Sequence, residues 1–224
     1  MDEAEVRDAL DRAARTLERG EGLGGTGFWK AVGEVRRTPA LAEELGPRIA
    51  EIDRRAFLDW ALLTVPNPLG TALASAAAII GLGAVGASYY LPDPADWLVF
   101  AAGGVALFAS THGLGHQVAG RMAGMRFSHW FVGSVRRPQP GVKVDYATYL
   151  TAPARSRAWM HATGALVTKV LPFALLPAAV AADLPEWMAW VLGGLGVAQI
   201  VTDALWSVKA SDWKKFRREM SYAP

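Results

Sequence analysis

Cysteine is absent from this 224-residue sequence, and charge of either sign is scarce. Without cysteine there can be no disulfide, thiolate zinc site, iron–sulfur cluster or cysteine nucleophile. Charged residues make up 20% of the chain against 52% hydrophobic residues, which excludes intrinsic disorder and argues against a purely soluble protein. The formal net charge of +2 is too small to indicate a nucleic-acid partner, and we expect none. The first 55 residues lack an apolar core of signal-peptide length, so we expect no cleaved export signal.

Four long apolar runs dominate the rest of the sequence. They cover residues 69–91, 97–119, 161–182 and 187–208. Each reaches the roughly 20 residues that a helix needs to cross about 30 Å of hydrocarbon. Because every backbone polar group must be satisfied inside lipid, these runs should be helical. The sequence therefore predicts an all-α polytopic membrane protein with four transmembrane helices.

The segments that join these runs differ in charge, and the difference predicts an orientation. Residues 92–96 and 183–186 are short and acidic, and they contain no lysine or arginine. The long link 120–160 and the C-terminal tail are instead rich in both. Positively charged residues are retained on the cytoplasmic side of a membrane. We therefore expect a protein of the cell or inner membrane with both termini in the cytoplasm.

The N-terminal part of the chain is expected to form a small cytoplasmic helical appendage, residues 1–56. Apolar residues at helical spacing from Val6 to Leu17 predict a short helix with one buried face. Thr38-Pro39 has the residue types of a cap and a first helical position, which predicts a second helix.

Two further divisions follow from composition. Residues 57–209 would form the membrane domain, and residues 210–224 a basic cytoplasmic tail. Within the long link, alternation over 127–133 and 142–150 predicts a small β-hairpin at the cytoplasmic side.

Ionisable side chains inside membrane spans are costly, so their positions indicate function. Here they are His112, His116, Lys169 and Asp203, with His161 at the edge of the third span. His112 and His116 are four residues apart, which places both imidazoles on one helical face within reach of a single metal ion. Two hydrogen-bonded histidines that pack a helix interface are the alternative interpretation.

Asp203 is a candidate for a third ligand because of its depth. Trp97 and Trp187 lie at the outer ends of the second and fourth spans. At a helical rise of 1.5 Å per residue, His112 lies about 22 Å along its span from Trp97, and Asp203 lies about 24 Å along its span from Trp187. The two side chains are therefore expected at a similar depth in the membrane. Two neutral imidazoles and one carboxylate suit zinc, with a fourth position open for water. We therefore expect His112, His116 and Asp203 to hold zinc. Lys169 offers an alternative, since an ion pair with Asp203 would satisfy that carboxylate without a metal.

The run HGLGHQVAGRMAGMR, which begins at His112, resembles the first motif of the site-2 protease family of intramembrane zinc metallopeptidases. That motif is HExxH on a membrane helix, followed by small residues. In this chain Gly113 stands in the place of the Glu. The resemblance covers roughly residues 69–209, and only this first motif is specific.

The resemblance implies a helical membrane fold and a zinc ion held by His112, His116 and Asp203. The family has Asp-Gly at the third ligand, whereas Ala204 follows Asp203 here. The next family helix begins with a Gly-Pro-containing segment, and residues 162–166 are similar to it but lack the proline.

Gly113 removes the group that such enzymes use for proton transfer. In HExxH enzymes the Glu takes a proton from the zinc-bound water and later gives one to the leaving amine. General acid–base catalysis of this kind contributes roughly 10²–10⁴ in rate. The resemblance therefore implies a metalloendopeptidase-like pseudoenzyme whose peptidase activity is impaired or absent. Its partners would be membrane lipid and transmembrane segments of other proteins, bound without being cut.

Two alternatives stay open at this point. An active intramembrane zinc metalloprotease would need another base, for which Asp145 in the cytoplasmic link is a candidate. A membrane scaffold without metal would instead keep Lys169 and Asp203 as an ion pair.

Overall fold

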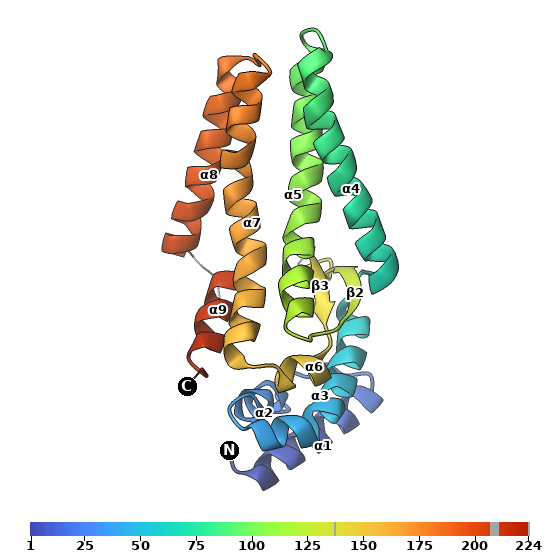
Figure 1. The fold of residues 1–224 in the computed structure, drawn as a ribbon. Coiled ribbons are helices and arrows are strands. Elements are labelled where there is room, and N and C mark those ends of the chain that lie inside the picture. Colours follow the sequence, from blue (N-terminus) through green and yellow to red (C-terminus); the bar gives the residue numbers. More distant parts are fainter. Residues whose placement is uncertain (137, 207–210, 224) are drawn as a thin grey trace. The chain divides into compact units, whose positions relative to one another are not determined.

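The computed structural model describes residues 1–136, 138–206 and 211–223. Figure 1 shows the chain from the N-terminus in blue to the C-terminus in red. It divides into two compact units, named here the sheet unit and the membrane unit. The sheet unit comprises residues 1–67, 120–157 and 219–224, and the membrane unit comprises residues 68–119 and 158–218. The sequence instead predicts three consecutive segments with boundaries at 56/57 and 209/210, whereas each observed unit combines separate stretches of the chain. The second predicted boundary lies outside the described residues.

Four long apolar helices build the membrane unit. They are α4 (Asn67–Ala87), extended by the short 3-10 helix η1 (Ser88–Tyr90), and α5 (Ala95–Met122), α7 (Ala154–Ala181) and α8 (Glu186–Trp206). All four are long and apolar enough to cross a membrane. The predicted fold class, an integral membrane protein with four membrane-spanning helices, is thereby confirmed. Helix α7 begins well before residue 161, and the predicted end of the fourth span at residue 208 lies outside the described residues.

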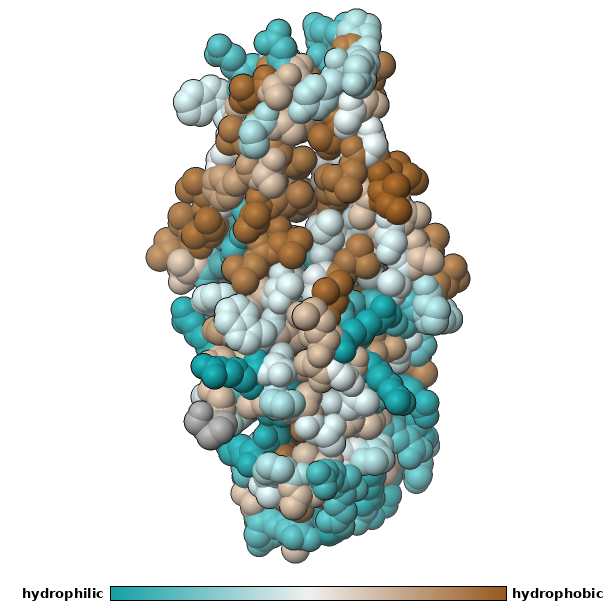
Figure 2. All heavy atoms as spheres, in the orientation of Figure 1, coloured by the Kyte–Doolittle hydropathy of each residue, from teal (hydrophilic) through white to brown (hydrophobic). Residues whose placement is uncertain are grey.

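Small residues set how closely α4 and α5 approach. A Cβ atom on Gly81 would lie 2.9 Å from the carbonyl oxygen of Gly103, and one on Gly103 would lie 2.7 Å from that of Gly81. Both positions therefore need glycine for the backbones to meet, as is common between membrane helices. On the face drawn in Figure 2, hydrophobic side chains gather over the long helices.

Three helices form the N-terminal part of the sheet unit: α1 (Glu3–Glu18), α2 (Phe28–Val35) and α3 (Pro39–Trp60). Val6 and Leu17 lie on the buried face of α1, and Asp2 caps that helix in a capping box with Glu5. Helix α3 begins after Thr38 with proline at its first position. The helices predicted for this region are confirmed.

A three-stranded antiparallel sheet of order β1-β2-β3 completes this unit: β1 (Leu63–Pro66), β2 (Phe127–Val132) and β3 (Pro140–Val144). The predicted hairpin is confirmed as the β2–β3 pair, in which Trp130 faces Val142. The prediction of strand up to residue 150 is wrong, because α6 (Tyr146–Thr151) begins immediately after β3. The Asp145 side chain accepts a hydrogen bond from the amide of Ala147 and so caps α6.

A buried ion-pair network ties the last residues of the chain into the sheet unit. Helix α9 (Asp212–Met220) carries Glu219, whose side chain is fully buried. The Arg157 Nε donates to Glu219 at 2.7 Å, and the Arg36 guanidinium lies 3.5 Å from the other carboxylate oxygen. Arg157 also donates to the carbonyl oxygens of Leu150 and Ala152. Two arginines thus share one carboxylate out of contact with water.

Candidate metal centre

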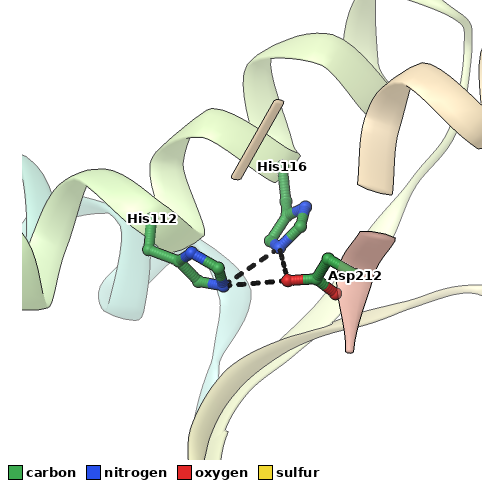
Figure 3. A group of neighbouring side chains, drawn as sticks. All are labelled: His112, His116 and Asp212. Carbon is green, nitrogen blue, oxygen red and sulfur yellow. Dashed lines mark hydrogen bonds and ion pairs between the residues drawn. The ribbon is translucent and has the colours of Figure 1, made fainter. Parts of the chain in front are cut away.

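Two histidines on α5 direct their Nε2 atoms toward the same point (Figure 3). The Nε2 atoms of His112 and His116 are 3.2 Å apart, and the two ring planes are nearly perpendicular at 87°. The i, i+4 spacing places both rings on one face of the helix, as the sequence predicts.

Backbone carbonyls of α7 orient both rings. The Nδ1 of His112 lies 3.0 Å from the carbonyl oxygen of Gly164, and the Nδ1 of His116 lies 2.7 Å from that of Met160. A carbonyl oxygen only accepts hydrogen bonds, so each Nδ1 carries a proton and donates it. When a ring is neutral, its Nε2 presents a lone pair to the common point; when it is protonated, its Nε2–H can donate to Asp212 instead. Metal-bound histidines are held in the same way, by a hydrogen bond from the second ring nitrogen.

Gly164 provides the space in which the His116 ring lies. A Cβ atom at this position would stand 2.3 Å from the Nε2 of His116 and 2.4 Å from its Cε1. Close approach of α5 and α7 also involves Gly115, whose Cβ would meet the Cα of Gly164 at 3.4 Å. The two glycines thus allow the backbones of α5 and α7 to approach closely and leave room for the His116 ring between the helices.

The third group is Asp212, the first residue of α9. Its Oδ2 lies 3.3 Å from the Nε2 of His112 and 3.3 Å from that of His116. Its other oxygen, Oδ1, accepts a hydrogen bond from the Nζ of Lys215 at 2.9 Å. Burial raises the pKa of the Asp212 carboxyl, but the contacts with both histidines and the positive charge of Lys215 outweigh burial and hold the pKa well below its usual value. The carboxylate is therefore ionised at neutral pH.

These three atoms form a set suited to a cation. When both rings are neutral, two Nε2 lone pairs and a carboxylate oxygen are all acceptors, and a positive ion between them would offset their mutual repulsion. His112, His116 and Asp212 are the one group of three or more potential ligands found among residues 1–136, 138–206 and 211–223. In a tetrahedral zinc site with bonds of about 2.0–2.1 Å, ligand atoms lie about 3.3–3.4 Å apart. The observed separations of 3.2–3.3 Å fit that geometry.

Asp203 lies elsewhere and has another partner. Its carboxylate on α8 forms an ion pair with the ammonium group of Lys169 on α7, the alternative that the sequence left open. The group of potential ligands that the structure brings together therefore has Asp212 in the place of Asp203. Counting residues along a helix gives depth but not the direction in which a side chain points, and the neighbouring ammonium already satisfies Asp203.

The two remaining candidate residues are also placed. The His161 ring lies 6.3 Å from that of His116, measured between centroids, but His161 does not belong to the three-residue group. Asp145, considered as a substitute base, belongs to the sheet unit and caps α6.

The sequence does not indicate that Asp212 belongs to this site, because it follows the last span in a segment with the composition of a basic tail. A signal is nevertheless present there. Trp213 and Phe216 give this short charged segment an apolar helical spacing, and Asp212 directly precedes them. That pattern predicts an amphipathic helix that packs on something, without saying on what.

No protein-family model matches this chain, and no curated protein or solved structure gives a significant match.

Proposed function

We propose that this protein is an integral membrane metalloprotein of the site-2 protease type, with zinc held by His112, His116 and Asp212 and with peptidase activity impaired or absent. One observation carries the proposal. The Nε2 atoms and a carboxylate oxygen converge at 3.2–3.3 Å while both Nδ1 atoms are committed to carbonyl oxygens.

The separations favour a metal ion over a proton as the shared cation. If the histidines were protonated, each Nε2–H would donate to Asp212 in a charge-assisted hydrogen bond of about 2.7–2.9 Å. The observed 3.3 Å is longer than that and close to the edge of a zinc tetrahedron. Lys215 supports the same arrangement, because its hydrogen bond to Oδ1 turns Oδ2 toward the histidines.

The residues around the site support loss of efficient proteolysis. Bound zinc would polarise a carbonyl group and lower the pKa of a bound water. The chain must then supply a group that carries the proton to the leaving amine, and Gly113 has no side chain to do so. Asp145 is engaged at the start of α6. We therefore propose that the protein recognises transmembrane segments of partner proteins without cleaving them.

The proposed orientation places both termini in the cytoplasm, because the basic link and tail obey the positive-inside rule. The absence of cysteine from the chain makes this easy to test. Single substitutions Ala223→Cys in the tail and Glu186→Cys at the start of α8 would be labelled with a membrane-impermeant maleimide. We expect Glu186→Cys to react in intact cells and Ala223→Cys to react only after the membrane is opened.

Zinc content of the purified protein tests the metal site. We expect one equivalent of zinc per chain in the wild type and its loss in His112→Ala and Asp212→Asn. His161→Ala is the matched histidine control and Asp203→Asn the matched carboxylate control, and both should retain zinc. Wild-type protein without zinc, or equal loss in Asp203→Asn and Asp212→Asn, contradicts the assignment.

Restoring the missing side chain tests the second half of the proposal. Gly113→Glu would supply the acid–base group of the HExxH motif and should raise cleavage of a reconstituted transmembrane substrate by roughly 10²–10⁴ over the wild type. If the wild type already cleaves the substrate and Gly113→Glu does not change the rate, the protein is instead an active protease that uses another base.

A further inference from the structure

A second candidate site lies in the membrane unit, in a cavity of about 430 Å³. It is lined by residues of α7, α8 and α9, and it shares no residue with the metal centre. Helix α9 lies beside α7 (Figure 1). An edge contact between Phe216 of α9 and Trp159 of α7 joins the two helices, and within α9 the Phe216 ring stacks on Trp213.

Most of the cavity wall is apolar. Leu166, Val170 and Phe173 of α7 face Ile200 of α8 across it. The Phe173 ring packs so closely against Gly196 that a Cβ there would lie 2.6 Å from the ring. Phe173 is 40% exposed and Val170 59% exposed, so the wall continues onto the outer surface of the helices. A cavity of this kind opens toward the hydrocarbon when the helices span a membrane.

The charges that line the cavity leave an excess of one positive charge. Lys169 is neutralised by its ion pair with Asp203. Arg217 of α9 also lines the cavity, its side chain is exposed, and no ion pair joins it to a carboxylate of the described residues. An apolar slot with an uncompensated guanidinium beside it suits an amphiphile with an anionic head.

We propose that this cavity binds an anionic phospholipid of the surrounding membrane, with one acyl chain along Val170, Phe173 and Ile200 and the head-group phosphate on Arg217. Basic pockets between membrane helices bind such head groups. The lipid site does not depend on the metal site.

Native mass spectrometry of the full chain tests this proposal. The protein would be released from mixed micelles that contain equal amounts of phosphatidylglycerol and phosphatidylcholine, and the retained lipid counted. We expect the wild type to retain phosphatidylglycerol preferentially. Arg217→Ala should reduce that preference about fivefold, the effect of one basic residue near a membrane surface. Lys214→Ala is the matched control, since it removes an exposed charge of α9 that does not line the cavity and should leave the preference unchanged.

A second pair of variants tests the acyl-chain slot. Ala204→Trp would fill the cavity from α8, whereas Ala198→Trp adds the same side chain at an exposed position of that helix outside the cavity. We expect loss of retained phosphatidylglycerol only in Ala204→Trp, with thermal unfolding showing that both variants are folded. Equal effects of Arg217→Ala and Lys214→Ala, an unchanged lipid content in Ala204→Trp, or a wild type without preference would each overturn the proposal. Loss of a bound transmembrane peptide in Ala204→Trp, with lipid unchanged, would also overturn it.

Discussion

Gly164→Ala is the smallest change that should dismantle the metal centre. The new methyl group would stand 2.3 Å from the Nε2 of His116, whereas carbon atoms make their best non-bonded contacts at about 3.5–4.0 Å. The imidazole would therefore have to move by about 1 Å or more. Metal–ligand distances tolerate only about 0.2 Å, so His116 would cease to be a ligand. The hydrogen bond from His112 to the Gly164 carbonyl would be disturbed by the same movement.

Zinc affinity would be measured in detergent against a chromophoric competing chelator. Loss of an orienting group alone costs about 10–100-fold in metal affinity, so displacement of a ligand should cost at least that much. Overpacking would also cost about 1–3 kcal/mol of stability, offset by about 0.5–1 kcal/mol because alanine favours a helix over glycine. Gly194→Ala on α8 is the control, since its Cβ would meet no atom within 4 Å. Wild-type zinc affinity in a folded Gly164→Ala protein would refute the reasoning.

Two ion pairs, one partly buried and one buried, give further predictions. Lys169→Met leaves Asp203 without its ammonium partner, so its thermal unfolding midpoint in detergent should fall, and adding Asp203→Asn should restore much of the loss. Midpoints that fall further in the double variant would contradict this account. Glu219→Gln leaves Arg36 and Arg157 buried without a carboxylate, which should cost about 3–5 kcal/mol and expose the sheet unit to limited proteolysis. Unchanged protease resistance of Glu219→Gln would show that the network contributes little.

Local patterns made much of the fold predictable. The four membrane helices follow from apolar runs, and α1 follows from a helical stripe, because each of these signals lies within one segment. Strand β1 was missed since Leu63–Pro66 acquires its strand partner from a distant segment, β2. The β3 prediction ran too far because apolar alternation continues past Asp145, whereas the capping hydrogen bond of that residue starts a helix.

The candidate site was predictable in part. The spacing of His112 and His116 is a property of one helix, so their convergence could be foreseen. The third group could not, because Asp212 belongs to a different helix whose packing depends on tertiary contacts such as that between Phe216 and Trp159. Depth counting selected Asp203 instead, and it could not tell which carboxylate would already have a lysine partner.

X-ray absorption at the zinc edge, on purified and zinc-loaded protein, tests the central claim most directly. The account predicts one zinc per chain, with two imidazole nitrogens at about 2.0–2.1 Å and a carboxylate oxygen at about 2.0–2.2 Å. Asp212→Asn should change this shell, and Asp203→Asn should leave it intact. A zinc shell without histidine, or a folded protein that takes up no zinc, would contradict the account.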